Sequence, residues 1–208
     1  MATVALALYL TFLLTAFGLR SVLQYRRTGS TGFHGVSGRP GSVEWWGGVL
    51  FVVALVLGLA APVLQLGSVI DALTVLDTTA VHVAGLIVAL AGIVGTLMAQ
   101  QTMGSSWRIG VDQRETTELV TADAFALVRN PIFSTMITAG MGLTLLAPNP
   151  IALAGLVALL AAIEIQVRAV EEPYLLRTHG QVYRGYASRV GRFFPGIGRL
   201  AVHADGVG

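Results

Sequence analysis

Two adjacent carboxylates, Glu171 and Glu172, follow a long apolar run and open the chemically richest stretch of the chain, residues 171–195. Arg, Tyr and His side chains follow them at helical spacing, and the stretch ends on Phe-Phe-Pro. A carboxylate pair of this kind can bind ribose hydroxyls or an ammonium group, or balance a sulfonium charge. Exposed acids at the end of a helix give the same pattern, so both interpretations stay open.

A second candidate site is the segment Arg129-Asn130-Pro131. Asn is favoured at the N-cap of a helix and Pro at the first helical position. The backbone N–H groups at such a helix start, beside Arg129, can bind a carboxylate or a phosphate. The alternative is a simple helix start with an Arg at the membrane surface.

Glu164 and Arg168 place ionisable groups inside or at the edge of an apolar run. Ionisable groups inside a membrane span are candidates for function. The four-residue spacing also allows an ion pair between them, and Glu171 falls on the same predicted helix face. Glu164 is therefore either a functional carboxylate or an acid that Arg168 neutralises.

The composition predicts an all-α integral membrane protein. Hydrophobic residues make up 54% of the 208 residues and charged residues 12%, against roughly a quarter charged in soluble domains.

The composition also excludes several kinds of chemistry. Without Cys, thiolate catalysis and disulfides are excluded, and without Lys so is Schiff-base chemistry. His residues have no partners at metal-ligand spacing, which predicts no metal site. The Arg distribution explains the basic pI better than nucleic-acid binding does.

Apolar runs of about 20 residues can cross a bilayer. The chain is predicted to form a single membrane domain, 1–208, with about five transmembrane helices. The spans are predicted at about 2–23, 43–66, 78–100, 131–147 and 151–170. Gly85, Ala89 and Gly92 recur on one face of the third span, as close helix packing in lipid requires.

Arg residues are concentrated in the segments 24–42, 101–129 and 171–208. The positive-inside rule then places these segments in the cytoplasm and the N-terminus outside. The C-terminal stretch is predicted to form an amphipathic helix at the cytoplasmic surface, bent or broken at Gly180 and Gly185. Its apolar side is predicted to hold Leu175, His179, Val182, Tyr186, Val190 and Phe193.

Three segments carry a resemblance to a known family. These are Gly104-Ser105-Ser106-Trp107 with Leu119-Val120-Thr121, then Arg129 to Phe133, and last the paired Glu with Leu175, Gly180, Tyr183, Tyr186, Arg189-Val190 and Phe194-Pro195. In this order the chain resembles the isoprenylcysteine carboxyl methyltransferases and their phospholipid methyltransferase relatives, over roughly residues 103–195.

The resemblance implies an S-adenosylmethionine-dependent methyltransferase of the cell membrane, with its active site on the cytoplasmic side. Its acceptor would be a lipophilic carboxylate, thiol or amine that enters from the bilayer. Segments 101–130 and 171–199 would bind the cofactor. Its cofactor-binding residues would be Leu119, Val120, Arg129, Asn130, Pro131, Phe133, Glu171, Glu172, Tyr183 and Tyr186. Arg168 and Glu172 are the predicted catalytic residues, with Arg168 facing the reacting centre.

The chain departs from the family pattern at several positions. Asn130 stands where His is usual, Phe125 and Phe133 where Tyr is usual, Asp123 where Gly is usual, and Thr117 where His is usual. Asn can cap a helix but does not titrate near neutral pH as His does. The departures indicate a divergent member.

Two other functions fit the residues. A membrane reductase of the sterol type resembles this family in its C-terminal half and would bind NADPH in the same place. A non-enzymatic lipid-binding accessory protein is the other possibility. The sequence indicates neither the acceptor nor the oligomeric state.

Overall fold

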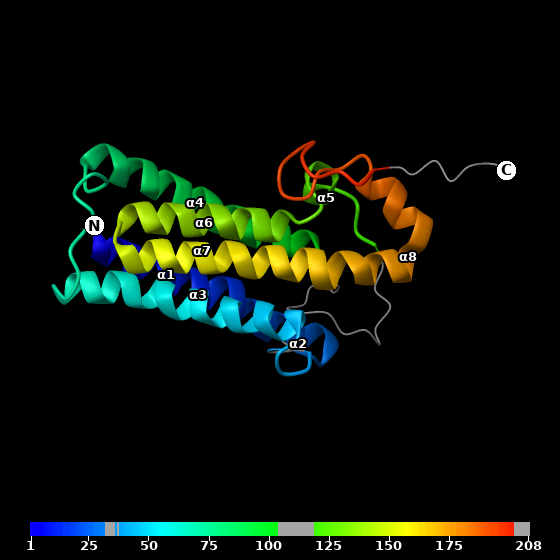
Figure 1. Cartoon of the computed structure of the whole chain (residues 1–208), viewed down its shortest axis with the longest axis horizontal. Coiled ribbons are helices and arrows are strands. Elements are labelled where there is room, and N and C mark those ends of the chain that lie inside the picture. The colour runs from blue at the N-terminus through cyan, green and yellow to red at the C-terminus, as the bar shows by residue number, and fades with distance from the viewer. Residues whose placement is uncertain (32–35, 37, 104–118, 202–208) are drawn as a thin grey trace.

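A computed structural model describes residues 1–31, 36, 38–103 and 119–201, and helices are the regular elements of these ranges. In chain order they are α1 (Ala2–Leu13), a π-helical turn (Leu14–Leu19), α2 (Arg20–Thr28), α3 (Val43–Leu66), α4 (Thr79–Thr102), α5 (Ala124–Leu127), α6 (Pro131–Leu146), α7 (Pro150–Ile165), a second π-helical turn (Gln166–Glu171) and α8 (Glu172–Ala187). Figure 1 shows the long helices running side by side as one bundle.

Four helices of the described chain are long and apolar enough to cross a membrane: Ala2–Thr28, Val43–Leu66, Thr79–Thr102 and Pro150–Ala187. The shorter apolar helix Pro131–Leu146 joins them. The predicted all-α integral membrane protein is confirmed. The first of these helices runs on to Thr28, beyond the predicted end of the first span at about 23, and the last runs past 170 into α8.

Small residues bring α4 and α6 into close contact. A side chain at Gly92 would overlap the backbone of Ala139, and one at Gly142 would overlap the backbone of Ala89. Backbones approach this closely only where side chains are absent or small, and in lipid such packing drives helix association. The predicted packing face on α4 is confirmed.

The second close pair is α3 with α7. Gly47 of α3 faces Ile165, and Gly155 of α7 faces Leu57. At the start of α7 the fully buried Asn149 accepts a hydrogen bond from the Ala152 N–H, 2.9 Å. Its Nδ2 donates to the carbonyl of Ala61 (3.0 Å) and to Gln65 Oε1 (2.9 Å), both on α3. The turn between α6 and α7 is thereby fixed to α3.

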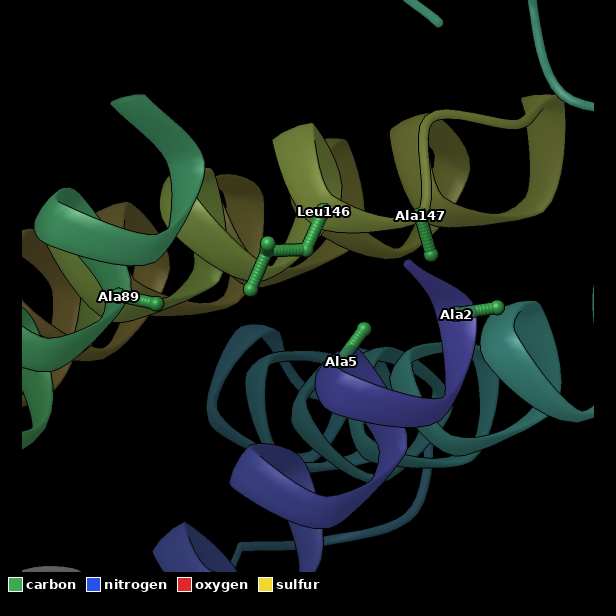
Figure 2. Close-up of a cluster of buried hydrophobic side chains, with 5 residues drawn as sticks. All are labelled: Ala2, Ala5, Ala89, Leu146 and Ala147. Carbon is green, nitrogen blue, oxygen red and sulfur yellow. The ribbon is translucent and has the colours of Figure 1, made fainter. Parts of the chain in front are cut away.

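The N-terminal helix closes the bundle against these pairs. Figure 2 shows Ala2 and Ala5 of α1 beside Leu146 and Ala147 at the end of α6, with Ala89 of α4 in the same cluster. All five are buried. Four of the five are alanines, so the contact again depends on small side chains.

The two ends of the bundle differ in chemistry. Figure 1 shows α2, α5, α8 and the C-terminal segment at one end, opposite the N-terminus. The Arg residues of the described chain lie in the segments at this end, whereas Asp71 and Asp77 lie in the α3–α4 connection at the other. This asymmetry is the one that the positive-inside rule uses.

The C-terminal helix bends where the sequence predicts a break. Gly180 has φ 51° and ψ −121°, a conformation that L-residues rarely adopt, whereas Gly185 lies within the helix. Within the predicted apolar side, Tyr186 is buried, whereas Val182, two residues after the bend, departs from the prediction. Val182 is 71% exposed, while Tyr183 is 1% exposed. The helix also ends at Ala187, before Val190 and Phe193.

We expect Gly142→Ala to lower the free energy of unfolding in detergent micelles by about 1–3 kcal/mol, because the added methyl group must push α4 away from α6. Gly185→Ala is the matched control. Its methyl group would meet no atom within 4 Å, and we expect a neutral effect or a gain of up to about 1 kcal/mol. Equal effects of the two substitutions, measured by thermal or denaturant unfolding, would contradict the packing argument.

Candidate functional site

The candidate site is built around the first turn of α6. Pro131 occupies the first helical position and Asn130 the N-cap, as predicted. The Asn130 side chain does not cap the helix, however. Its Nδ2 donates instead to the carbonyl of Arg192, 3.2 Å away. Ser134 Oγ, one turn along, donates to the carbonyl of Phe193 at 2.8 Å.

The C-terminal segment 188–200 packs on this helix start through its backbone. The N–H of Arg129 donates to the carbonyl of Gly191 (2.8 Å), and the N–H of Asn130 donates to the carbonyl of Arg192 (3.1 Å). Gly191 is required here, because a side chain would overlap the carbonyl oxygen of Phe194. Residues more than 60 positions apart in sequence thus meet at the end of the bundle (Figure 1).

Arg129 lies under this segment with its side chain 1% exposed. Nη1 lies 2.8 Å from Glu172 Oε1 and donates to the Tyr183 hydroxyl at 3.1 Å. Nη2 donates to the carbonyl of Gly198 at 2.6 Å. Nε is buried and has no acceptor among the described residues. A buried donor without an acceptor lowers the stability of the folded protein, and a ligand oxygen can bind at such a donor.

Glu172 is shared between two arginines. Arg192 Nε donates to Glu172 Oε1 at 2.7 Å, and Arg192 Nη2 donates to Oε2 at 2.8 Å, which makes a bidentate pair. Oε1 also faces Arg129. The hydrogen bonds that Arg192 donates to Glu172 raise the pKa of Arg192 above its already high value, so its guanidinium stays charged. The three side chains together carry a net charge of about +1.

Two tyrosines of α8 form the apolar wall beside these charges. The rings of Tyr183 and Tyr186 lie 6.1 Å apart and are tilted by 59°. The hydroxyl of Tyr186 donates to the carbonyl of Phe125 at 2.6 Å, which ties α8 to α5. Leu119 is partly buried against the same tyrosines.

Arg168 lies apart from this cluster. It forms an ion pair with Glu164 one turn away, as its spacing predicts, and its side chain is 60% exposed. Arg168 lies in the π-helical turn Gln166–Glu171. It is exposed, whereas Glu172, four residues on, is buried. Glu171 is half-buried and accepts a hydrogen bond from Gln166 Nε2 at 3.4 Å.

The other predicted residues lie around the cluster. Pro131 is buried at the start of α6, and Val120 is half-buried in the segment before α5. Phe133 packs against the transmembrane core formed by Phe12, Ala16 and Met136. The motif Gly104-Ser105-Ser106-Trp107 and Thr117 lie outside the described residues.

Sequence reasoning assigned no site role to Arg192, which it placed on the polar side of a continuing helix. Gly191 and Pro195 are turn-forming residues, and they could have indicated that the chain folds back at this point. The contact with Glu172 depends on that return. It joins residues 20 positions apart.

A cavity of about 60 Å³ lies between α1, α3, α6 and α7 and is lined mainly by apolar side chains. None of the predicted site residues lines it. It runs from Met136 toward Ala147, away from the start of α6 that holds Arg129. We therefore place the candidate site at the polar cluster rather than at this cavity.

Residues 80–182 match the family model of the phospholipid methyltransferases. The chain carries a phospholipid methyltransferase domain. The match begins in α4 and ends in α8, so it includes Arg129 and both glutamates, whereas Tyr183, Tyr186 and Arg192 lie beyond it. The resemblance predicted from the sequence is confirmed, and the family supports a membrane methyltransferase as the general class. The comparisons with curated proteins and with solved structures found no match.

Asp123 stands where the family usually has Gly, and this position allows a test of backbone strain. Asp123 has φ 51° and ψ −122°, where an L-residue is strained and glycine is not. We expect Asp123→Gly to raise the free energy of unfolding by about 1 kcal/mol, measured by denaturant unfolding in micelles. Asp123→Ala keeps the β carbon and should bring no such gain. If alanine stabilises as much as glycine, the effect is not one of backbone strain.

Proposed function

We propose that this chain transfers a methyl group from S-adenosylmethionine to a lipophilic acceptor held in the membrane. The phospholipid methyltransferase match over residues 80–182 carries the proposal. The polar cluster at the start of α6 supports it, because Arg129 and Glu172 of the matched segment meet there in a buried ion pair. Buried charges at the end of a membrane bundle are costly and usually functional.

The residues present suit the cofactor chemically. S-adenosylmethionine carries a carboxylate, an ammonium group, ribose hydroxyls and a sulfonium that supplies the methyl group. Arg129 suits the carboxylate, because its buried Nε–H has no acceptor in the described chain. Glu171 and Glu172 suit the ammonium or the ribose hydroxyls. Tyr183 and Tyr186 would form the wall of the cofactor site.

The remaining predicted residues would complete the same pocket. Asn130 and Pro131 set the start of α6. Leu119 and Val120 approach from the segment before α5, and Leu119 already packs on the two tyrosines. Phe133 would act less directly, since it packs into the transmembrane core one turn deeper.

Arg168 is proposed to orient an anionic acceptor. It is exposed in the π-helical turn that follows α7, about 27 Å along the helix axis from Pro150, near the depth where hydrocarbon gives way to headgroups. A lipid that diffuses in the bilayer can reach this position.

For the reaction itself, the protein would mainly position its reactants and exclude water. Methyl transfer is an in-line displacement at the sulfonium-bound carbon. A carboxylate acceptor needs no base, whereas an amine or a thiol must first lose a proton. We place the cluster on the cytoplasmic side and the N-terminus outside, because the described Arg residues lie at the same end of the bundle as Arg129.

The cofactor assignment can be tested by isothermal titration of the purified protein in detergent with S-adenosylhomocysteine and, separately, with NADPH. We expect saturable binding of S-adenosylhomocysteine alone, because the cluster offers groups for an amino acid and a ribose. Binding of NADPH alone would favour a reductase of the sterol type. Binding of neither would favour a non-enzymatic accessory protein.

Substitutions of the two predicted catalytic residues, Glu172 and Arg168, should have different effects. Glu172→Gln should weaken S-adenosylhomocysteine binding about tenfold or more, because the neutral side chain pairs poorly with Arg129 and Arg192. Arg168→Ala should leave that binding unchanged and lower the rate of methyl transfer, because Arg168 pairs with Glu164 instead. The measurements are calorimetry and transfer of radiolabelled methyl to membrane lipids.

Exposed Arg177 of α8 provides the matched control for the loss of one positive charge. Arg177→Ala should change neither binding nor turnover. If Glu172→Gln and Arg168→Ala both keep full activity with a native fold, their assignment as catalytic residues is wrong.

A further inference from the structure

Arg192 contacts two residues of the proposed cofactor site in different ways. Its guanidinium holds both carboxylate oxygens of Glu172, at 2.7 and 2.8 Å. Its backbone carbonyl accepts from Asn130 twice, from the N–H at 3.1 Å and from Nδ2 at 3.2 Å. One residue thus fixes a side chain of α8 and the first turn of α6.

The side-chain contact determines the orientation of Glu172. A guanidinium that binds both oxygens fixes the plane of the carboxylate, which a single hydrogen bond does not. With this plane fixed, Oε1 also meets Arg129 Nη1 at 2.8 Å. Without Arg192, Glu172 would keep only the Arg129 contact and could rotate about its last torsion. Arg129, which is 1% exposed, would then lose its fixed partner.

The backbone contact makes this arrangement depend on the C-terminal segment. The Arg192 N–H donates to the carbonyl of Ile197 at 2.8 Å, and the neighbouring Phe193 carbonyl accepts from Ser134. The side chain of Arg192 therefore starts from a backbone that is held on both sides. The guanidinium therefore reaches Glu172 from a fixed starting point, with no rearrangement of the backbone.

We propose that Arg192 is the positioning residue of this site, which acts on the cofactor through Glu172 and Asn130. The inference rests on the proposed function, because it takes Glu172 to contact S-adenosylmethionine. Arg192 lies beyond the stretch that matches the family model, and it touches neither Arg168 nor Glu164 by hydrogen bond or ion pair in the described chain. Its effect should fall on cofactor binding and not on the acceptor.

The experiment compares Arg192→Gln, Arg192→Lys and the control Arg189→Gln, with S-adenosylhomocysteine affinity measured by calorimetry. We expect Arg192→Gln to weaken binding about tenfold. Arg192→Lys should recover part of the loss, because it keeps the charge but cannot bind both oxygens. Arg189 is exposed on the same segment, and Arg189→Gln should leave the affinity unchanged.

Two further readouts distinguish positioning from a merely structural role. In methyl transfer, Arg192→Gln should raise KM for S-adenosylmethionine and leave kcat at saturating cofactor within about twofold. In the background of Glu172→Gln, the same substitution should add little further loss of affinity, since the residue through which it acts is already altered. Arg192→Lys supplies the same comparison if Arg192→Gln does not fold.

The possible outcomes distinguish a failure of the role proposed for Arg192 from a failure of the proposed function. If the unaltered protein does not bind S-adenosylhomocysteine, the proposed function fails and the role of Arg192 fails with it. If it binds, and folded Arg192 variants bind equally well, only the positioning role is overturned. Effects of Arg192→Gln and Glu172→Gln that simply add, or a loss confined to kcat, would overturn it as well.

Discussion

The carboxylate of Glu172 between Arg129 and Arg192 is the interaction on which the rest of the site depends. Removing such charges from water costs several kcal/mol per ion, and only good geometry with further hydrogen bonds offsets that cost. Here the further bonds come from Tyr183 and from the carbonyl of Gly198. The ion pair therefore requires α6, α8 and the C-terminal segment to be in place together. Removing any one of them would leave a buried charge without its partners.

The transmembrane helices determine where this cluster can form. Close packing against α4 through Gly92 and Gly142 places α6 inside the bundle, and α6 has only 16 residues, about 24 Å. A helix this short does not span the roughly 30 Å of hydrocarbon alone. The N–H groups at the start of a helix have no intrahelical acceptor. Residues 188–200 pack on this helix start and satisfy the N–H groups of Arg129 and Asn130.

Features that depend on local sequence could be predicted from it, whereas features that require distant segments of the chain to fold back onto one another could not. Hydropathy gave the spans, Pro131 the start of α6, and the four-residue spacing the Glu164–Arg168 pair. On α8, periodicity placed Val182 on the apolar side, but beyond the bend at Gly180 it is Tyr183 that is buried. The periodicity of apolar residues assumes a continuous helix, so it does not reveal such a shift. The arginine pair on Glu172 was missed for the related reason that tertiary contacts leave no periodic signal.

The departures from the family pattern that fall within the described residues lie beside the charged cluster rather than within it. Asn130 uses its amide to hold the Arg192 carbonyl, a contact that requires a donor but no titrating group. Phe133 packs among core side chains, so a hydroxyl there would face apolar neighbours. Asp123 affects only the backbone that leads into α5. The packing around the cluster thus accommodates these residues, while the buried charges of Arg129, Glu172 and Arg192 stay paired with one another.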